Sequence, residues 1–429
     1  MSRLTRRQFL GTTAAAAAAV SAPDAWARPA WAQTKELRML VWSHFVPAYD
    51  KWLDQFVADW GTKNNVKVVI DHIPHLNLAS KIAAEIATQS GHDIVQLAAS
   101  GTEKFAPSLL DLSDLADKLG KRHGGWTPLA ENYSTYKGKY HSIPDYFIDF
   151  PGLYRKDLWA DIGMPNGPDT WDELLQGGRK LKAKGFPIGI GLAHHNDSRN
   201  SWRAIMWSHG GSEVAKDGKT ITFNSKEVRD ALKYLKALYK ETMTPEVLAW
   251  DDASNNRFLA SGRGSWIHNP ISAYRTIENS DKALAEKIHV QLSPRGPAGR
   301  LSFANCLAYG ITKFSKSQDT AKAFLESLTD NFTDAFRAST GYNNPFLKKY
   351  AKGPLPIISE DPKLKVLEKS PEYHYTIGYP GSLTVPADEV YQQFVMIDTV
   401  AQFCSDRLDL EAAVKWGEEK IKSIYAKFV

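Results

Sequence analysis

The chain has 429 residues, of which 43% are hydrophobic and 24% charged, and its formal net charge is +5. This length is ample for two or three domains with a large core, and the composition is that of an ordinary globular protein. Residues 1–32 contain four of the 53 basic and one of the 48 acidic residues, so the remainder has a net charge of only +2. The charge therefore gives no reason to expect nucleic acid binding.

The first 32 residues have the features of an export signal. Thr5 to Leu10 matches the twin-arginine pattern, and residues 14–20 form a weakly apolar stretch that is too short to span a bilayer. Small residues suited to cleavage end at Ala27 and again at Ala32, and no Cys lies nearby to carry a lipid anchor. We therefore predict a twin-arginine signal peptide over residues 1–32 and a mature protein that is soluble in the periplasm.

The elements up to residue 97 alternate between strand and helix. Continuous apolar runs predict strands, and apolar residues spaced three and four apart predict helices. This alternation implies a parallel sheet with right-handed crossovers, whose ligands bind beyond the carboxyl ends of the strands. In chain order the elements are a strand at 37–42, a helix at 49–60, a strand at 66–70, a helix at 78–87 that ends at Gly91, and a strand at 93–97.

A change from one folded body to another is predicted within residues 138–174. Residues 140–143 are a short β-prone run that we expect to end at Pro144. Thr170, with Glu173 three residues later, forms a capping-box pattern, which predicts the start of a helix.

The same patterns predict the rest of the chain. They indicate strands at 186–192, 220–223 and 304–312, helices that begin at Ser225 and Ser317, and a terminal helix near 411–425.

Enzyme signatures are absent from the sequence. It contains no G-x-S-x-G, no H-E-x-x-H and no G-x-G-x-x-G. Cys306 and Cys404 are the only cysteines, and the sequence leaves open whether they form a disulfide or stay as buried thiols. We predict no metal site, no cofactor and no enzymatic activity.

Short motifs along almost the whole chain resemble one family. GKYHSIPDYF at 138–147 is followed by GLYRKDLWADIGMPNGPDTWDEL at 152–174, and further motifs lie at 257–266, 290–297 and 340–345. Together they resemble the extracellular solute-binding proteins of carbohydrate ABC importers, the maltose-binding-protein-like group.

The resemblance implies an α/β protein with the two-lobed fold of type II periplasmic binding proteins. Each lobe would be a mostly parallel sheet flanked by helices, and the chain would cross between the lobes at three hinge segments. The motif positions assign residues 33–145 and 269–340 to lobe 1, and residues 146–268 and 341–429 to lobe 2.

A cleft between the lobes would hold the ligand, and residues at strand ends and crossovers are the candidates for binding it. Aromatic rings stack on the C–H faces of sugars, whereas polar side chains bind their hydroxyls. For every candidate, core packing, capping or simple solvation is the alternative. The stacking candidates are Trp42, Trp202, Trp250 and Trp266, and the others are His44, Ser100, Asp145, Tyr146, Asp251, His268, Asn305 and Tyr342.

These residues and the resemblance imply the periplasmic binding component of an ABC importer. It would take a sugar or sugar-like polyol, close over it by hinge bending and deliver it to the membrane permease. We expect a monomer with no nucleic acid partner. A phosphorylated polyol or a polyamine is an alternative ligand, and Arg199 and Arg203 keep the phosphorylated ligand open.

A secreted glycoside hydrolase is the alternative from another class of protein. It would need two carboxylates that face each other, such as Asp145 with Asp149 or Asp251 with Asp252. The family resemblance argues against hydrolysis.

Overall fold

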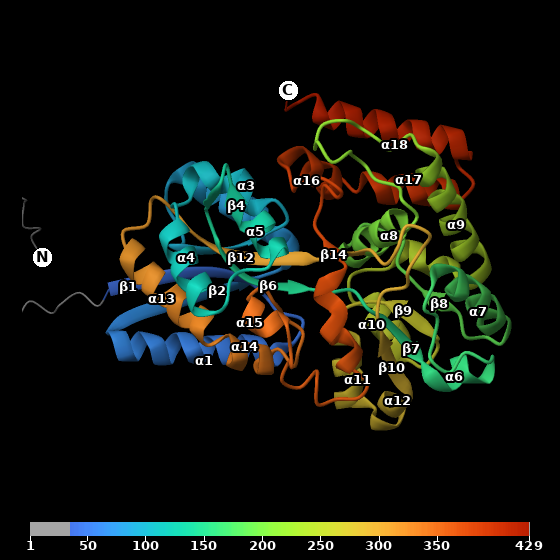
Figure 1. Cartoon of the computed structure of the whole chain (residues 1–429), viewed down its shortest axis with the longest axis horizontal. Coiled ribbons are helices and arrows are strands. Elements are labelled where there is room, and N and C mark those ends of the chain that lie inside the picture. Colours follow the sequence, from blue (N-terminus) through green and yellow to red (C-terminus); the bar gives the residue numbers. More distant parts are fainter. Residues whose placement is uncertain (1–34, 429) are drawn as a thin grey trace, which may run out of the picture.

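Two bodies lie side by side in the computed structural model, which describes residues 35–428 (Figure 1). The first body contains a six-stranded sheet in the order β13-β6-β12-β3-β1-β2, and the second contains a four-stranded sheet in the order β10-β7-β9-β8. The two-lobed α/β architecture predicted from the sequence is therefore confirmed. The predicted signal peptide lies outside the described residues.

The first lobe begins with the predicted alternation of strand and helix. β1 (Lys35–Trp42) lies between β2 (Val66–Ile73) and β3 (Ile94–Ala98) and is parallel to both. Helices α1 (Pro47–Asn64) and α2 (Leu78–Thr88) connect them. Helix α2 ends one residue beyond the predicted 78–87, and its left-handed cap is Gln89, at φ 51°, and not Gly91.

Strand β6 (Ile143–Ile148) runs through Pro144, where we predicted a strand end. Pro144 pairs with Ala308 and Tyr146 pairs with Leu307, so the register shifts and Asp145 is the extra residue of a bulge. Proline lacks the N–H group that a regular ladder needs, and a bulge accommodates it. The strand can therefore continue toward the second lobe.

The prediction of mostly parallel sheets is wrong outside the β2-β1-β3 unit. In the first lobe, β12 (Asn305–Ile311) is antiparallel to both β3 and β6, and β13 (Asn344–Pro345) is antiparallel to β6. In the second lobe, β7 (Gly152–Arg155) is antiparallel to its neighbours β9 (Trp266–His268) and β10 (Ile288–Gln291). Within the described residues, the one parallel pairing in this second sheet is that of β8 (Ile188–Gly189) with β9. Strand β8 is shorter than predicted. Both sheets are therefore mixed, because antiparallel strands from other parts of the chain pair beside the parallel ones.

The structure corrects the predicted lobe boundaries at 268 and 340. Since β9 and β10 lie in the second sheet, residues 269–291 stay with the second lobe. β12 and β13 lie in the first sheet, so the first lobe includes residues 305–345. The crossings therefore lie near 149–151, within 292–304, and after β13. The apolar pattern of a strand does not reveal in which of two sheets it pairs, which explains the error.

Helix starts in the second lobe follow the predicted caps. At α7 (Trp171–Ala183), the Thr170 hydroxyl and the Glu173 carboxylate form the complete capping box. At α9 (Lys226–Thr242), the Ser225 hydroxyl accepts from the N–H of Val228. The strand predicted at 220–223 is reduced to a single bridge between Val214 and Ile221.

The remaining elements complete the two bodies. Around the first sheet lie α3 (Gly101–Phe105), α4 (Ser113–Arg122), α5 (Pro128–Ser134), α13 (Gln318–Asp330), α14 (Phe332–Ala338), α15 (Lys348–Ala351) and the hairpin β4 (Thr135–Tyr136) with β5 (Lys139–Tyr140). With the second sheet lie α6 (Lys156–Asp161), α8 (Asn196–Ser208), α10 (Ser254–Ala260), α11 (Ser272–Ser280), α12 (Lys282–Lys287), α16 (Val385–Gln392), α17 (Val395–Cys404) and α18 (Leu410–Tyr425) (Figure 1). Between the lobes, β11 (Ser302–Phe303) pairs with β14 (His374–Tyr375).

Two further points bear on the sequence predictions. Cys306 and Cys404 are both buried and free, one in each lobe. None of the helices within residues 35–428 is both long enough and apolar enough to cross a membrane.

Candidate functional site

A cavity lies between the two lobes. It is partly open to solvent, and side chains of both lobes line it. The first lobe lines it with His75 after β2, Ala98 at the end of β3, and Asn305 at the start of β12. The second lobe lines it with Arg199 from α8 and Tyr391 from α16. The cavity therefore lies at the carboxyl ends of the parallel strands, where α/β sheets bind ligands.

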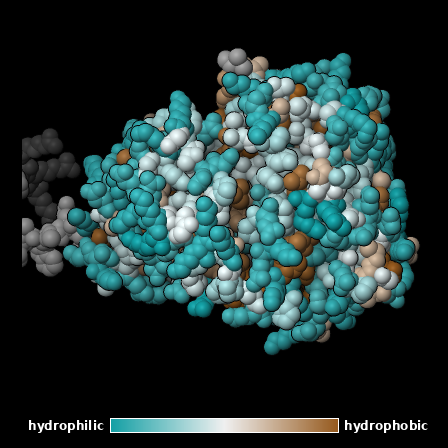
Figure 2. Space-filling view, in the orientation of Figure 1, coloured by the Kyte–Doolittle hydropathy of each residue, from teal (hydrophilic) through white to brown (hydrophobic). Residues whose placement is uncertain are grey.

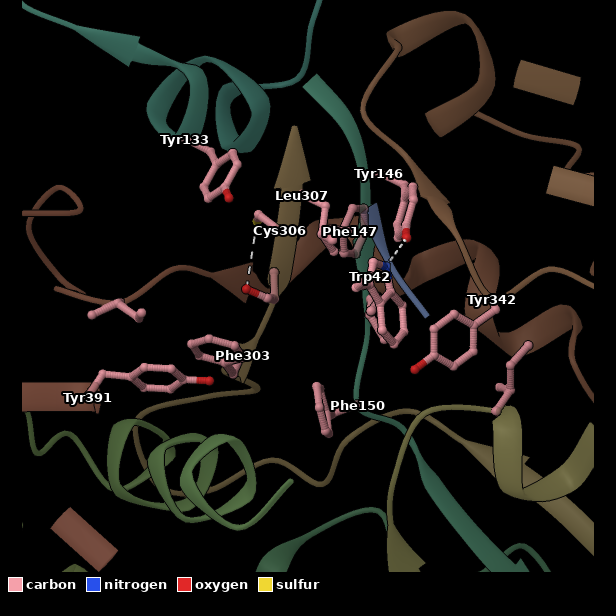
Figure 3. Close-up of a cluster of buried hydrophobic side chains, with 14 of the residues drawn as sticks. Trp42, Tyr133, Tyr146, Phe147, Phe150, Phe303, Cys306, Leu307, Tyr342 and Tyr391 are labelled. Atoms are coloured by element: carbon pink, nitrogen blue, oxygen red, sulfur yellow. Dashed lines mark hydrogen bonds between the residues drawn. The ribbon is translucent and has the colours of Figure 1, made fainter. Parts of the chain in front are cut away.

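The surface around this seam differs from the rest of the visible face. Figure 2 shows hydrophobic side chains along the line where the two bodies meet, on a face that is otherwise mostly hydrophilic. Inside, the rings of Phe303 and Tyr391 are stacked with centroids 5.6 Å apart and an interplanar angle of 8° (Figure 3). Both rings line the cavity.

Arg199 lies over the face of Tyr391, with its guanidinium carbon 3.7 Å from the ring centroid. Its Nη1 donates to Gln392 Oε1 at 3.0 Å and its Nη2 donates to Asn196 Oδ1 at 2.5 Å. The residue is only 1% exposed, and burial lowers the pKa of its guanidinium. The ring and the amides thus hold a cation at the cavity wall.

Two carboxylates lie at the amino-terminal end of α8. Asp252 accepts from the backbone N–H of Asn196 at 2.6 Å and lies 3.3 Å from His195 Nδ1. Although burial raises the pKa of Asp252, these hydrogen bonds outweigh it and hold the pKa below its usual value. Asp197 receives a hydrogen bond of 2.7 Å from Asn255, and burial together with the charge of Asp252 raises its pKa. Asp252 therefore caps the helix that carries Arg199.

Several hydrogen bonds join the lobes directly, among them two from Arg275 on α11 to the Thr340 carbonyl at 2.8 and 3.0 Å and one from Ser100. Ser100 follows β3 in the first lobe, and its hydroxyl donates to Asp388 Oδ2 on α16 at 2.5 Å. Gln392 donates to the other oxygen of Asp388 at 3.0 Å. Burial raises the pKa of Asp388. This bond forms only when the two lobes are close together, as they are here.

A group of aromatic side chains in the first lobe contacts His75 through Trp42. Trp42 packs edge-on against His75, with ring centroids 5.5 Å apart, and its indole N–H donates to Tyr146 Oη at 2.7 Å (Figure 3). His44 packs against Tyr342 at 4.9 Å. Burial lowers the pKa of both histidines to about 4, so both are neutral at physiological pH.

The structure places two of the twelve predicted site residues at the gap between the lobes, and four more in a buried first-lobe group that contacts His75 on the cavity wall. Asn305 lines the cavity, and Ser100 spans the gap to Asp388. The other four are in that first-lobe group: Trp42, His44, Tyr146 and Tyr342.

Four other predicted site residues belong to the interior of the second lobe. Trp266 is 0% exposed and stacks on His268, whose two ring nitrogens face serine hydroxyls at 2.9 and 3.0 Å. Trp202 is also 0% exposed, and its indole N–H donates to the Gly191 carbonyl. Trp250 packs against Phe258 at 5.1 Å. These strand-end and loop side chains fold inward and pack within the second lobe, and none of the four lines the cavity.

The last two predicted residues lie apart from the cavity. Asp145 is at the β6 bulge, where Gln96 lies at 3.4 Å, and burial raises its pKa to about 7. Asp251 is exposed and forms an ion pair of 2.7 Å with Arg257. Neither side chain lines the cavity.

Sequence reasoning missed several residues at the site. His75 follows a strand in the same way as Trp42, and the carboxyl-end rule applied to β2 would have found it. Arg199 was noticed only as a possible sign of phosphate. Phe303, Tyr391 and Asp388 lie in segments without a local motif, and only the pairing of β11 with β14 brings Phe303 to the cavity.

Comparisons with known proteins are consistent with this arrangement. A sequence profile of the family described as bacterial extracellular solute-binding protein matches residues 52–366. The diacetylchitobiose binding protein DasA of Streptomyces coelicolor is 23% identical over 329 residues, which are 73% of this chain and 75% of that protein. A probable ABC transporter-binding protein of Deinococcus radiodurans is 25% identical over 227 residues, 51% of this chain and 54% of that protein.

Solved structures share the fold at low sequence identity. Maltose-bound MalE3 of T. maritima has a TM-score of 0.78 and 22% identity, and the match covers 91% of this chain and 99% of that one. A sugar transporter protein of Arthrobacter chlorophenolicus with bound laminaribiose has a TM-score of 0.76 and 18% identity, with 91% and 99% covered. These likenesses support the two-lobed architecture.

Proposed function

Because the chain belongs to the bacterial extracellular solute-binding protein family, we propose that it is the substrate-binding component of an ABC importer. It takes a sugar or sugar-like polyol between its two lobes and delivers it to the membrane permease. The observation that carries this proposal is the cavity at the carboxyl ends of β2 and β3, which side chains of the second lobe close.

The chemistry of the cavity fits a ligand with apolar faces and hydroxyls. Phe303 and Tyr391 offer aromatic surface, whereas Asn305, His75 and Arg199 offer polar groups. Relatives support a sugar, since DasA is named as a diacetylchitobiose binding protein and similar structures hold maltose and laminaribiose. We propose Trp42, His44, Tyr146 and Tyr342 as the support that holds His75 in place, with Ser100 as a contact between the closed lobes.

The lobes in this proposal have corrected limits. Residues 35–148 and 305–351 form lobe 1, and residues 152–291 with 374–428 form lobe 2. Contacts made by one ligand with both lobes favour the closed arrangement over an open one, and the permease recognises the closed state.

The remaining parts of the proposal concern export and chemistry. The protein is exported by the twin-arginine route, is cleaved after Ala27 or Ala32, and acts as a monomer in the periplasm. It is not an enzyme. In support, the carboxylates near the cavity already have partners: Asp252 caps α8, and Asp388 binds Ser100 and Gln392.

A thermal-shift screen of the mature protein tests this function. Sugars, polyols, sugar phosphates and polyamines are added in turn, because a ligand that binds only the folded state raises the melting temperature. We expect a shift with at least one sugar or polyol and none with polyamines. A shift with polyamines alone would overturn the sugar assignment. Turnover of a chromogenic glycoside would instead favour the hydrolase alternative.

A further inference from the structure

Helix α8 carries two buried arginines that differ in how their charge is balanced. Arg199 and Arg203 are each 1% exposed. Arg203 Nε forms an ion pair of 2.7 Å with Glu213. Arg199 has no carboxylate within 4.0 Å in the described part of the chain, and its Nε has no hydrogen-bond partner there. Burying a charged group without a counter-charge is costly, so Arg199 is the arginine that needs an anion.

The acceptors that Arg199 does have are uncharged. They are the side-chain oxygens of Asn196 and Gln392 and the backbone carbonyl of Tyr391, the last at 3.4 Å. The carboxylates next in reach are engaged elsewhere. Asp388 accepts from Ser100 and Gln392, and Asp252 caps the first turn of α8. These groups position the guanidinium and leave its charge unpaired.

The cavity beside Arg199 is lined by apolar side chains and by a few polar ones, including His75, Asn305 and Gln392. No Asp or Glu is among the described residues that line it. On the opposite wall, the Asn305 amide lies 3.5 Å from His75 Nε2. An amide that donates to Nε2 leaves the proton of the neutral ring on Nδ1, and this buried nitrogen has no hydrogen-bond partner among the described residues. His75 from the first lobe and Arg199 from the second thus line the same cavity.

Within the proposed function, on which this inference rests, we propose that the ligand is an acidic sugar or polyol. Its carboxylate or phosphate is bound by Arg199, with His75 and Asn305 contributing from the other lobe. A planar guanidinium with a free N–H suits both kinds of anion. The apolar surface that lines the rest of the cavity, including Phe303 and Tyr391, then covers the body of the ligand.

Titration calorimetry on the mature protein tests this with ligand sets that differ only in the acidic group. Glucose is compared with glucuronate and glucose 6-phosphate, and galactose with galacturonate and galactose 6-phosphate. We expect an acidic member to bind at least tenfold more tightly than its neutral parent, and the advantage to shrink as salt is added. The uronate and phosphate members distinguish the two anions.

Variants identify the residue responsible. Arg199→Gln should remove the preference for the acidic member, and Arg199→Lys should restore only part of it. Arg257→Gln, which changes an exposed arginine of the same lobe paired with Asp251, should bind as the wild type does. If Arg199→Gln does not fold, the ligand comparison on the wild type still decides.

The outcomes separate this inference from the proposed function. Binding of neutral sugars with equal or weaker binding of their acidic forms overturns the inference and leaves the function standing. Binding of no sugar, polyol or acidic derivative overturns both.

Discussion

Two groups of aromatic and histidine side chains lie near strand ends, one in each lobe, and they serve different purposes. In the second lobe, both nitrogens of His268 have hydroxyl partners at 2.9 and 3.0 Å. In the first lobe, Nδ1 of His75 has no hydrogen-bond partner within residues 35–428, and the residue lines the cavity. We call the first-lobe group the gap cluster and the second-lobe group the core cluster. The gap cluster is Trp42, His44, His75, Tyr146 and Tyr342, and the core cluster is Trp171, Trp266, His268, Ser201 and Ser293.

The difference shows what separates packing from binding in this protein. A buried histidine with both nitrogens satisfied has no capacity left for a ligand. A histidine beside a cavity, with an unpaired nitrogen, has that capacity. Substitutions in the core cluster should therefore change the free energy of unfolding, whereas substitutions in the gap cluster should change ligand affinity.

The largest effect is expected from Trp266→Ala. The side chain is 0% exposed and packs against Trp171 and His268. Truncating such a ring should lower the free energy of unfolding by about 3–5 kcal/mol, measured by urea denaturation at pH 7. Trp416→Ala, at a half-buried position on α18, is the control and should cost clearly less. Equal losses for the two variants would contradict the assignment of Trp266 to the core.

The second prediction concerns acid stability. Burial lowers the pKa of His268 to about 3, so below pH 6.5 the unfolded chain takes up a proton that the folded protein does not. This contribution to stability is present above pH 6.5 and is lost as the pH falls, by about 1.4 kcal/mol per pH unit.

The variant His268→Gln measures this contribution. Its free energy of unfolding should fall less steeply between pH 6.5 and 4.5 than that of the wild type. Parallel slopes for wild type and His268→Gln would mean that His268 is not held neutral by burial.

The third prediction concerns the gap cluster. His75→Ala should weaken binding of the sugar found in the thermal-shift screen by about tenfold, since a lost hydrogen bond is worth about 1 kcal/mol or slightly more. Calorimetry gives the affinity and urea denaturation gives the stability. Affinity should change more than stability, the reverse of the result for His268. A variant that loses stability with unchanged affinity would place His75 with the core.

The sequence was sufficient for local structure in both lobes. Apolar runs located β1, β2 and β3, and the Thr170 and Ser225 caps located the starts of α7 and α9. These features depend on neighbours in the chain, which a sequence displays directly.

The sequence was not sufficient to distinguish the two clusters. Trp42 is the last residue of β1 and Trp266 the first of β9, so the sequence shows both as tryptophans at strand ends. The two tryptophans differ in the strand that pairs with their own strand and in the helix that covers it. Both of these elements come from segments that are distant in the sequence. For the same reason, the motif search found Asn305 but missed Phe303, which reaches the cavity only by pairing with residues near 374.

The smallest effect is expected from Ser100→Ala. This variant tests whether a serine hydrogen bond between the lobes has a different effect from serine hydrogen bonds within one lobe. Ser201 and Ser293 bind His268 inside the second lobe, whereas Ser100 binds Asp388 across the gap. Losing this bond should make the closed arrangement less favourable, relative to the open one, by about 1 kcal/mol. The free energy of unfolding of each lobe should not change. Small-angle scattering of the ligand-free variant should therefore give a larger radius of gyration than the wild type, and added ligand should reverse it.

Ser134→Ala is the matched control, because this serine is also 0% exposed in the first lobe but its hydroxyl has no partner in the described part of the chain. It should leave the radius of gyration unchanged. An unchanged radius for Ser100→Ala as well would mean that other contacts between the lobes, such as those of Arg275 with Thr340, hold them together without this bond. Contacts between the ligand and the unpaired groups of the cavity would then have to supply all of the free energy by which the ligand favours closed lobes.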